Sequence, residues 1–312
     1  MSVKILGAVA LVTAVAWGLH AGGGSLPRTP VNACGDSAVL SWIPESPREG
    51  TLFRVRVSGV LPGSRLTGEA AGEDLHFVAV PDDSTTVESF AALPIDGPDT
   101  VAVEVRCSLT GASDRLSAVV TASPGQYPVE RLRVAPAFGR RPDSALAARI
   151  RRESQRALEV ARNSHATPPL WRGSFVLPRE SRVTSGFGHG REFNGTITSR
   201  HMGTDFAGAT GAPVRAANRG VVRIVDSFFY GGNVVYVDHG AGLTSAYLHL
   251  SEQLVTAGDT VEAGQLIGRV GATGRVTGPH LHLIVRYGSV TVDPLSLFEI
   301  AGEPAEGRGP AK

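Results

Sequence analysis

Short runs in which apolar and polar residues alternate fill the first part of the chain. Every second residue is apolar from Phe53 to Val57 and again from Val101 to Cys107, as expected of half-buried strands. Clusters of Pro, Gly, Ser and Asp separate these runs and are typical of turns. The pattern predicts an immunoglobulin-like β-sandwich over residues 26–125.

A helical period replaces this alternation near the middle of the chain. Asp143 follows Pro142 and can accept the hydrogen bond that caps a helix, which we expect to run over residues 143–164. One side of this helix is apolar and is formed by Leu146, Ile150, Ala157, Leu158 and Ala161. Most of its arginines fall elsewhere, so we predict a connector helix with a solvated basic face, inside a linker of residues 126–170.

Strand patterns return after residue 170 and are now interrupted by glycine. The stretch 183–290 contains 19 of the 38 glycines and six of the nine histidines, and it has almost no helical periodicity. We therefore predict a glycine-rich antiparallel β domain over residues 171–300, followed by a disordered tail over residues 301–312. The chain as a whole is expected to be mainly β.

The charge balance excludes one broad class of function. Thirty lysines and arginines against 29 acidic residues give a net charge of +1. Bulk binding to nucleic acid is excluded, because it relies on a basic surface that neutralises phosphates. An apolar content of 42% and a charged content of 19% are typical of a folded protein and not of a disordered chain.

Residues 1–25 have the layout of a secretory signal peptide. Lys4 precedes a short apolar run, Ile5–Trp17, which is too short to cross a bilayer comfortably. This segment predicts export to the periplasm, the cell envelope or the medium. The alternative is an uncleaved N-terminal anchor, which would be the protein's only contact with a membrane.

Cys34 and Cys107 are the only two cysteines. In an exported protein such a pair is more often a disulfide than two free thiols. Cys107 continues the apolar side of its predicted strand, where a partner can meet it. We therefore predict a Cys34–Cys107 disulfide, and two cysteines so far apart make a zinc–thiolate site a poor interpretation.

The histidines of the glycine-rich domain fall into a pattern with chemical meaning. His280 and His282 are two residues apart, so on a strand both imidazoles lie on one face. His201 and Asp205 are four apart and share one face of an extended segment in the same way. His249 lies between two leucines that face the core, so it is expected on the opposite face.

Two imidazoles and one carboxylate form a competent ligand set for Zn²⁺ and leave a fourth position open. Two further histidines can then supply a general base and a hydrogen-bond donor to an oxyanion. By contrast, we expect His239 to be structural, in a turn after a strand, and His189 to lie in a mobile loop without a part in the site.

Three segments carry a resemblance to a known family. Arg200–Ala207 (RHMGTDFA), Tyr247–Ser251 (YLHLS) and Gly278–His282 (GPHLH) resemble the signature segments of the lysostaphin/LytM-like zinc metallopeptidases. The likeness extends from about Val183 to Leu295. The preceding β-sandwich region is similar to the upstream half of many exported members, less specifically.

The resemblance implies a role for each residue of the cluster. His201, Asp205 and His282 would be the ligands of one Zn²⁺ per chain, His280 the general base, and His249 the residue that stabilises the tetrahedral intermediate. The implied substrate is the peptide part of bacterial peptidoglycan. Every position of the family pattern is filled, which favours an active enzyme over a non-enzymatic peptidoglycan-binding activator of other cell-wall hydrolases.

The sequence leaves several details of this site open. In some relatives an upstream asparagine occupies the metal's open position and keeps the enzyme latent, and Asn194 is the residue in question here. Tyr247 is expected to shape the cleft. Specificity is expected in the loops Gly188–Thr198 and Asp226–Gly232, and the scissile bond, the physiological process and the oligomeric state stay undetermined.

Two other classes of site share parts of the pattern. Two histidines and a carboxylate also describe the facial triad of non-haem Fe(II) oxygenases, but export and the two additional histidines argue against that reading. The segment Val255–Gly268 resembles the hairpins of biotinyl and lipoyl carrier domains, which attach their cofactor to a lysine. Lys4 and Lys312 are the only lysines, so the domain has none and the carrier interpretation fails.

Overall fold

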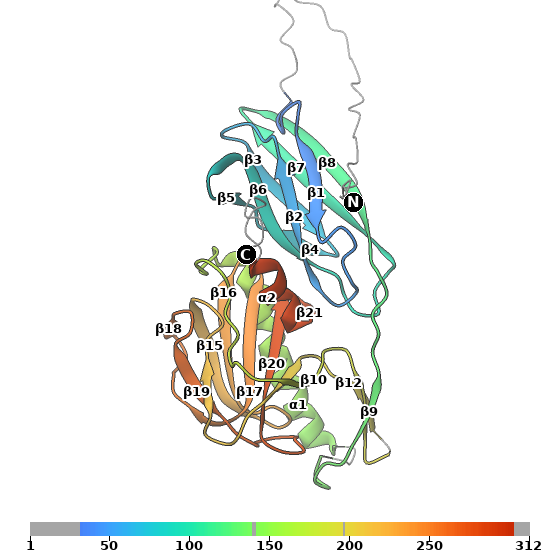
Figure 1. Ribbon diagram of the computed structural model, residues 1–312, viewed down its shortest axis with the longest axis vertical. Coiled ribbons are helices and arrows are strands. Elements are labelled where there is room, and N and C mark those ends of the chain that lie inside the picture. Colours follow the sequence, from blue (N-terminus) through green and yellow to red (C-terminus); the bar gives the residue numbers. More distant parts are fainter. Residues whose placement is uncertain (1–31, 139–141, 196, 303–312) are drawn as a thin grey trace, which may run out of the picture. The chain divides into compact units, whose positions relative to one another are not determined.

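The computed structural model describes residues 32–138, 142–195 and 197–302, which form two compact units (Figure 1). Unit 1 comprises the described residues up to Pro47 together with Phe53–Ala91 and Pro98–Ala122. Unit 2 comprises Arg48–Leu52, Ala92–Gly97 and the chain from Ser123 onward. The predicted signal segment, residues 1–25, and most of the predicted tail lie outside the described residues.

Unit 1 consists of two four-stranded antiparallel sheets, with strand orders β1-β2-β6-β5 and β4-β3-β7-β8. The strands are β1 (Val39–Ile43), β2 (Leu52–Ser58), β3 (Arg65–Ala70), β4 (Glu73–Leu75), β5 (Val78–Val80), β6 (Asp83–Ala92), β7 (Thr100–Leu109) and β8 (Ala112–Thr121). The prediction of a mainly β structure is confirmed, while the immunoglobulin-like classification stays a prediction.

The predicted alternation sets the inward face of each sheet in unit 1. Val55 and Val57 on β2 are fully buried, as are Val103 and Val105 on β7, and the residues between them are more exposed. Burying one such side chain stabilises the fold by roughly 1.5–3 kcal/mol. The predicted disulfide is also present, because Cys107 on this buried face of β7 is bonded to Cys34.

Unit 2 is built on a larger sheet whose main path runs β10-β13-β20-β17-β16-β15-β18, with every neighbouring pair antiparallel. Its strands are β10 (Val183–Ser185), β13 (Thr204–Ala207), β14 (Pro213–Arg215), β15 (Gly220–Phe228), β16 (Gly232–Gly240), β17 (Leu243–Gln253), β18 (Thr260–Val261), β19 (Leu266–Val270), β20 (His280–Tyr287) and β21 (Val290–Val292). This sheet confirms the predicted antiparallel β domain. A short helix, α2 (Pro294–Gly302), follows it.

The central strands of this sheet are covered on both faces. Val235 and Val237 on β16 belong to one buried apolar cluster, whereas Val234 and Tyr236 belong to another that also contains Ala157. Because both faces are covered, these strands are almost continuously apolar instead of alternating.

Ala157 belongs to helix α1 (Ser144–Asn163), which confirms the predicted helix. The Asp143 carboxylate accepts a hydrogen bond from the Leu146 backbone N–H at 2.8 Å, as expected of the N-cap. The helix packs against the sheet of unit 2, where Arg156 pairs with Asp226 on β15 at 2.6 Å (Figure 1). It is therefore a structural layer of unit 2. Among the described residues no helix is long and apolar enough to cross a membrane.

A separate three-stranded sheet brings an earlier part of the chain into unit 2. Strand β9 (Val129–Leu132) lies within the segment expected to be a linker and pairs in parallel with β11 (Gly190–Phe193). Strand β11 pairs on its other side with β12 (Ile197–Arg200). Since β11 and β12 lead directly to His201, this sheet places β9 next to the candidate site. A short 3₁₀ helix, η1 (Ser164–Ala166), directly follows α1.

The Cys34–Cys107 bond closes a chain segment with a sequence separation of 73 residues. We expect the double variant Cys34→Ala/Cys107→Ala to lower the free energy of unfolding of unit 1 by roughly 4 kcal/mol, since the unfolded chain is no longer constrained. Urea unfolding of the full chain measures the change. Wild-type protein under reducing conditions is the control and should unfold at the same urea concentration as the variant. An unchanged midpoint in the variant would contradict the expectation.

Candidate metal centre and active site

Three predicted ligands meet in one buried cluster of unit 2. His201 Nε2 lies 3.0 Å from Asp205 Oδ1 and 2.9 Å from His282 Nδ1, and His282 Nδ1 lies 2.7 Å from Asp205 Oδ1. Asp205 on β13 is directly opposite His282 on β20 in the antiparallel register, which explains their approach. All three side chains are buried.

His201 reaches the cluster by a different path from the one expected. It follows β12, where its backbone N–H donates to the His189 carbonyl at 2.7 Å, and a turn with a bend at Gly203 separates it from Asp205 on β13. Gly203 lies within this turn, and a Cβ atom at that position would come within 2.7 Å of the His282 ring. Only glycine therefore lets the turn pass close enough to His282 for the three ligand atoms to meet.

Backbone carbonyls fix the tautomer of three histidines around the cluster. The Nδ1 atoms of His201, His249 and His280 lie 2.7, 2.8 and 2.8 Å from the carbonyl oxygens of Gly186, Thr273 and Gly278. A carbonyl oxygen only accepts, so each Nδ1 carries the proton and each Nε2 keeps its lone pair when the ring is neutral. For His201 this leaves the Nε2 lone pair available to a metal ion.

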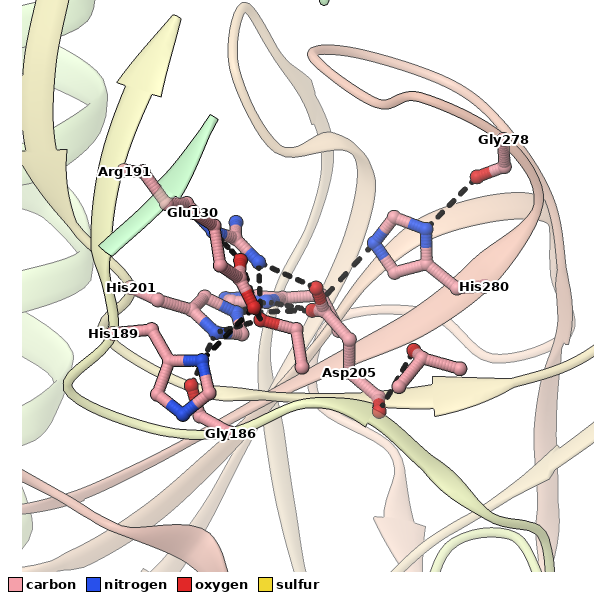
Figure 2. A network of polar contacts seen from close by, with 11 residues as sticks. Glu130, Gly186, His189, Arg191, His201, Asp205, Gly278 and His280 are labelled. Carbon is pink, nitrogen blue, oxygen red and sulfur yellow. Dashed lines mark hydrogen bonds and ion pairs between the residues drawn. The ribbon is translucent and has the colours of Figure 1, made fainter. Parts of the chain in front are cut away.

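The two additional histidines lie beside the ligand cluster. His280 Nε2 is 3.6 Å from Asp205 Oδ1 (Figure 2). The His249 ring centroid is 4.9 Å from that of His280 and 5.7 Å from that of His282. The structure thus brings together all five residues predicted for the site.

The expectation for Tyr247 is wrong. Its side chain is fully buried in a core cluster together with Leu250, and its hydroxyl accepts a hydrogen bond from the Ala217 backbone N–H at 2.7 Å. Burial raises the pKa of this hydroxyl to about 12. The alternation along β17 breaks at His249, whose φ of 64° is in the left-handed region, so Tyr247 and Leu250, three residues apart, face the same core.

Burial and local charge give the cluster the ionisation that a metal site needs. Burial alone would raise the pKa of Asp205, but hydrogen bonds with His201 and His282 hold it well below its usual range. Burial lowers the pKa of His282 to about 4 and that of His249 well below its ordinary value. At neutral pH Asp205 is therefore a carboxylate and His282 a neutral imidazole, which are the forms that bind a metal ion.

A carboxylate from β9 organises a polar network behind His201. Glu130 accepts a hydrogen bond from the Ser185 hydroxyl at 2.9 Å and lies 2.9 Å from His189 Nδ1 (Figure 2). Ser185 Oγ in turn lies 3.0 Å from His201 Nδ1. Arg191 from β11 joins the network, donating to Ser185 at 3.1 Å and to Asp205 Oδ2 at 2.6 Å. The network orients the His201 ring and neutralises the charge of the Asp205 carboxylate.

Sequence reasoning missed this network. His189 does lie in a loop, as predicted, but its imidazole is bound to Glu130 and is part of the site's surroundings. The sequence held one hint of this network. The segment Ser185–Gly188 is part of the family resemblance although it contains no proposed metal ligand, which points to a supporting role near the site. Glu130 had no comparable signal, because only the parallel pairing of β9 with β11 brings it to the site.

Two other predicted details are resolved by side-chain contacts. The Asn194 side chain donates to the Val134 carbonyl at 3.2 Å and accepts from the Val134 N–H at 3.1 Å, so it is bound to the segment after β9 and is absent from the ligand cluster. His239 is structural, as predicted, although it lies within β16. It is fully buried between the Arg219 carbonyl and the Ser245 hydroxyl.

Two clefts border the cluster. One, of about 600 Å³, is lined by Asp205 and His280 among others. The other, of about 180 Å³, is lined by His201, His249 and His282. Arg191 and Arg275 line both clefts. A ligand that extends from one cleft to the other would therefore pass these two arginines.

An antiparallel β domain with two histidines and one aspartate converging in a cleft has the features of a metallopeptidase. Residues 199–294 match the model of Peptidase family M23, and the chain contains a domain of this family. The matched range includes all five predicted site residues.

Two relatives agree with this assignment, and a solved structure shares the fold. The chain is 42% identical over 117 residues to peptidoglycan DD-endopeptidase ShyB of Vibrio cholerae, covering 36% of this chain and 27% of ShyB. It is 52% identical over 88 residues to peptidoglycan DD-endopeptidase ShyA of the same organism, covering 28% of this chain and 20% of ShyA. The chain thus spans only about a quarter of these relatives. A crystal structure named as a peptidase M23 from Pseudomonas aeruginosa shares the fold over 82% of this chain and 96% of its own, with a TM-score of 0.63 and 23% identity.

The position of Glu130 behind His201 gives a prediction about metal affinity. Glu130→Gln keeps the size of the side chain but removes the charge that holds Ser185 and His189. We expect the affinity for Zn²⁺ to fall by about 10-fold or more, as is usual when a partner of a metal-binding histidine is lost. Competition with a chromogenic chelator measures it.

Glu192→Gln is the matched control for this variant. Glu192 lies on the neighbouring strand β11 and pairs with Arg131 at 3.6 Å, away from the ligands. It should bind Zn²⁺ as the wild type does. Equal affinities in the Glu130 variant and the wild type would show that the network does not orient His201.

Proposed function

We propose that unit 2 is a zinc metalloendopeptidase that hydrolyses peptide bonds in bacterial peptidoglycan. The observation that carries the proposal is the convergence of His201, Asp205 and His282, with His280 and His249 beside them. The M23 domain and the relatives named as peptidoglycan DD-endopeptidases support the same reaction and substrate.

The donor set fits Zn²⁺. Two imidazole nitrogens and one carboxylate oxygen within hydrogen-bond distance of one another match the usual ligands of a catalytic zinc site, which keeps one position for water or substrate. Bound zinc lowers the pKa of a coordinated water to roughly 7 and polarises a carbonyl group. We propose His201 Nε2, Asp205 and His282 Nδ1 as the ligands.

His280 is proposed as the general base. Its Nδ1–H is held by the Gly278 carbonyl, so its Nε2 lone pair faces the side of the cluster where Asp205 lies. A neutral imidazole in this orientation can take the proton of the attacking water and later pass it to the leaving amine.

His249 is proposed to stabilise the tetrahedral intermediate. Since its Nδ1–H is bound to the Thr273 carbonyl, Nε2 can donate a hydrogen bond only after it has taken up a proton. Burial opposes that protonation in the free site. The negative charge that would develop on the attacked carbonyl oxygen favours it, so His249 would take a proton from solvent as that charge forms and return it when the intermediate collapses.

We further propose that the protein is exported and acts in the cell envelope. The signal-like residues 1–25 support this, and the Cys34–Cys107 bond is typical of proteins from oxidising compartments. A non-enzymatic role, in which the domain binds peptidoglycan and activates another hydrolase, is the competing outcome of the experiment below.

Two histidine variants separate metal binding from proton transfer. Purified zinc-loaded protein should release peptide fragments from peptidoglycan, detected by mass spectrometry. We expect His201→Ala to lose both zinc and activity. His280→Ala should keep its zinc but lose activity by about 100-fold or more, because only the base is removed.

His76→Ala, in unit 1, is the control and should keep both zinc and activity. Normal turnover by His280→Ala would refute the assignment of the base. Binding of peptidoglycan without release of fragments by zinc-loaded wild type would favour the activator instead.

A further inference from the structure

Arg275 is held in an unusual position in the loop that precedes β20. Its backbone N–H donates to the Tyr230 carbonyl at 2.9 Å, which ties the loop to the turn between β15 and β16. Its guanidinium carbon lies 4.2 Å from the ring centroid of Phe193 and 4.2 Å from that of Tyr230. Two aromatic rings therefore fix the orientation of the guanidinium.

This guanidinium has no anionic partner within the described residues. No carboxylate of that part of the chain lies within ion-pair distance of Arg275, and no hydrogen bond from its side chain reaches a described residue. Its neighbour Arg191 differs, because it pairs with both Asp205 and Glu130. Desolvation lowers the pKa of Arg275, with a smaller contribution from the charge of Arg191.

An unpaired cation that is partly removed from water is costly to the fold. Contact with two aromatic faces offsets part of this cost but uses none of the five N–H donors of the guanidinium. A group arranged in this way is preorganised to bind an anion, because its orientation is already fixed and its donors are unused. Arginine matches a carboxylate best, through two parallel hydrogen bonds.

The location of Arg275 identifies where that anion would lie. Arg275 lines the cleft beside Asp205 and His280 as well as the cleft beside His201 and His249. An anion bound to it would therefore belong to a ligand that crosses the metal centre. Arg182 is exposed on the wall of the larger cleft and adds a second positive charge there.

On the basis of the proposed peptidase function, we infer that Arg275 is a specificity-determining residue that binds a carboxylate of the substrate peptide beside the scissile bond. The substrate is then a cross-link whose residues next to that bond carry a free carboxylate. A bridge made only of glycine has no side-chain carboxylate to offer, so it is not the preferred substrate.

A pair of synthetic cross-linked peptides tests the inference. The two peptides differ only in whether the residues that flank the scissile bond carry free carboxylates or carboxamides. We expect the zinc-loaded wild type to cleave the carboxylate peptide with a kcat/KM at least about 10-fold higher, as a hydrogen-bonded charge pair implies. Arg275→Gln should lose this preference, mainly through a higher KM for the carboxylate peptide.

Two further variants separate recognition from structure. Arg275→Lys keeps the charge but not the two parallel donors, so it should restore only part of the preference. Arg152→Gln, on the exposed surface of α1, should keep the full preference. Zinc content and thermal unfolding of Arg275→Gln check that the variant is folded.

The outcomes distinguish this inference from the proposed function. If the wild type cleaves both peptides equally, or if Arg275→Gln keeps the preference, the role of Arg275 is refuted and the peptidase proposal stands. If the zinc-loaded wild type cleaves neither peptide nor purified peptidoglycan, the proposed function is refuted and the inference with it. Loss of zinc or of folding in Arg275→Gln would show a structural role and would also overturn the inference.

Discussion

The antiparallel pairing of Asp205 with His282 is the constraint on which the rest of the site depends. Pairing of β13 with β20 sets a carboxylate opposite an imidazole in a buried position, where neither can rely on water for its polar contacts. The third proposed ligand, His201, enters from a segment that can pass close to His282 only because residue 203 is glycine. The metal centre therefore follows from strand register and one close backbone approach, and a shift of one residue in that register would turn one ligand away from the other.

The remaining elements of unit 2 hold this geometry rigid from two sides. One apolar cluster and helix α1 cover opposite faces of β16 and β17, and β17 pairs with β20, which carries His280 and His282. Backbone carbonyls also fix the tautomers of three histidines of the cluster. The Nε2 atom of each ring is therefore the one left to meet a metal ion or a substrate before either binds. Sites on strands are positioned more accurately than sites on loops, and Asp205, His249 and His282 all lie on strands of this sheet.

Local patterns predicted those parts of the structure that depend on local geometry. The alternation along β2 and β7, the Asp143 cap and the two-residue spacing of His280 and His282 each follow from a single element, and each is confirmed. Features that arise when distant segments meet were missed. Glu130 reaches the site only through parallel pairing of β9 with β11, which no spacing along the chain encodes. Tyr247 was misplaced because strict alternation fails at a residue with positive φ.

The arginines around the cluster differ in whether their charge is balanced by a carboxylate, and the net charge of +1 does not show this difference. Arg191 is already paired with Asp205 and Glu130, so its charge is satisfied within the fold. Arg275 lies close enough to feel the charge of Arg191, yet its only described side-chain partners are two aromatic rings. A carboxylate from a ligand would cancel that remaining charge without competing for the metal ligands. Recognition and catalysis can then rest on different residues of one cleft, so the preference for a charged substrate can be altered while the metal centre is left intact.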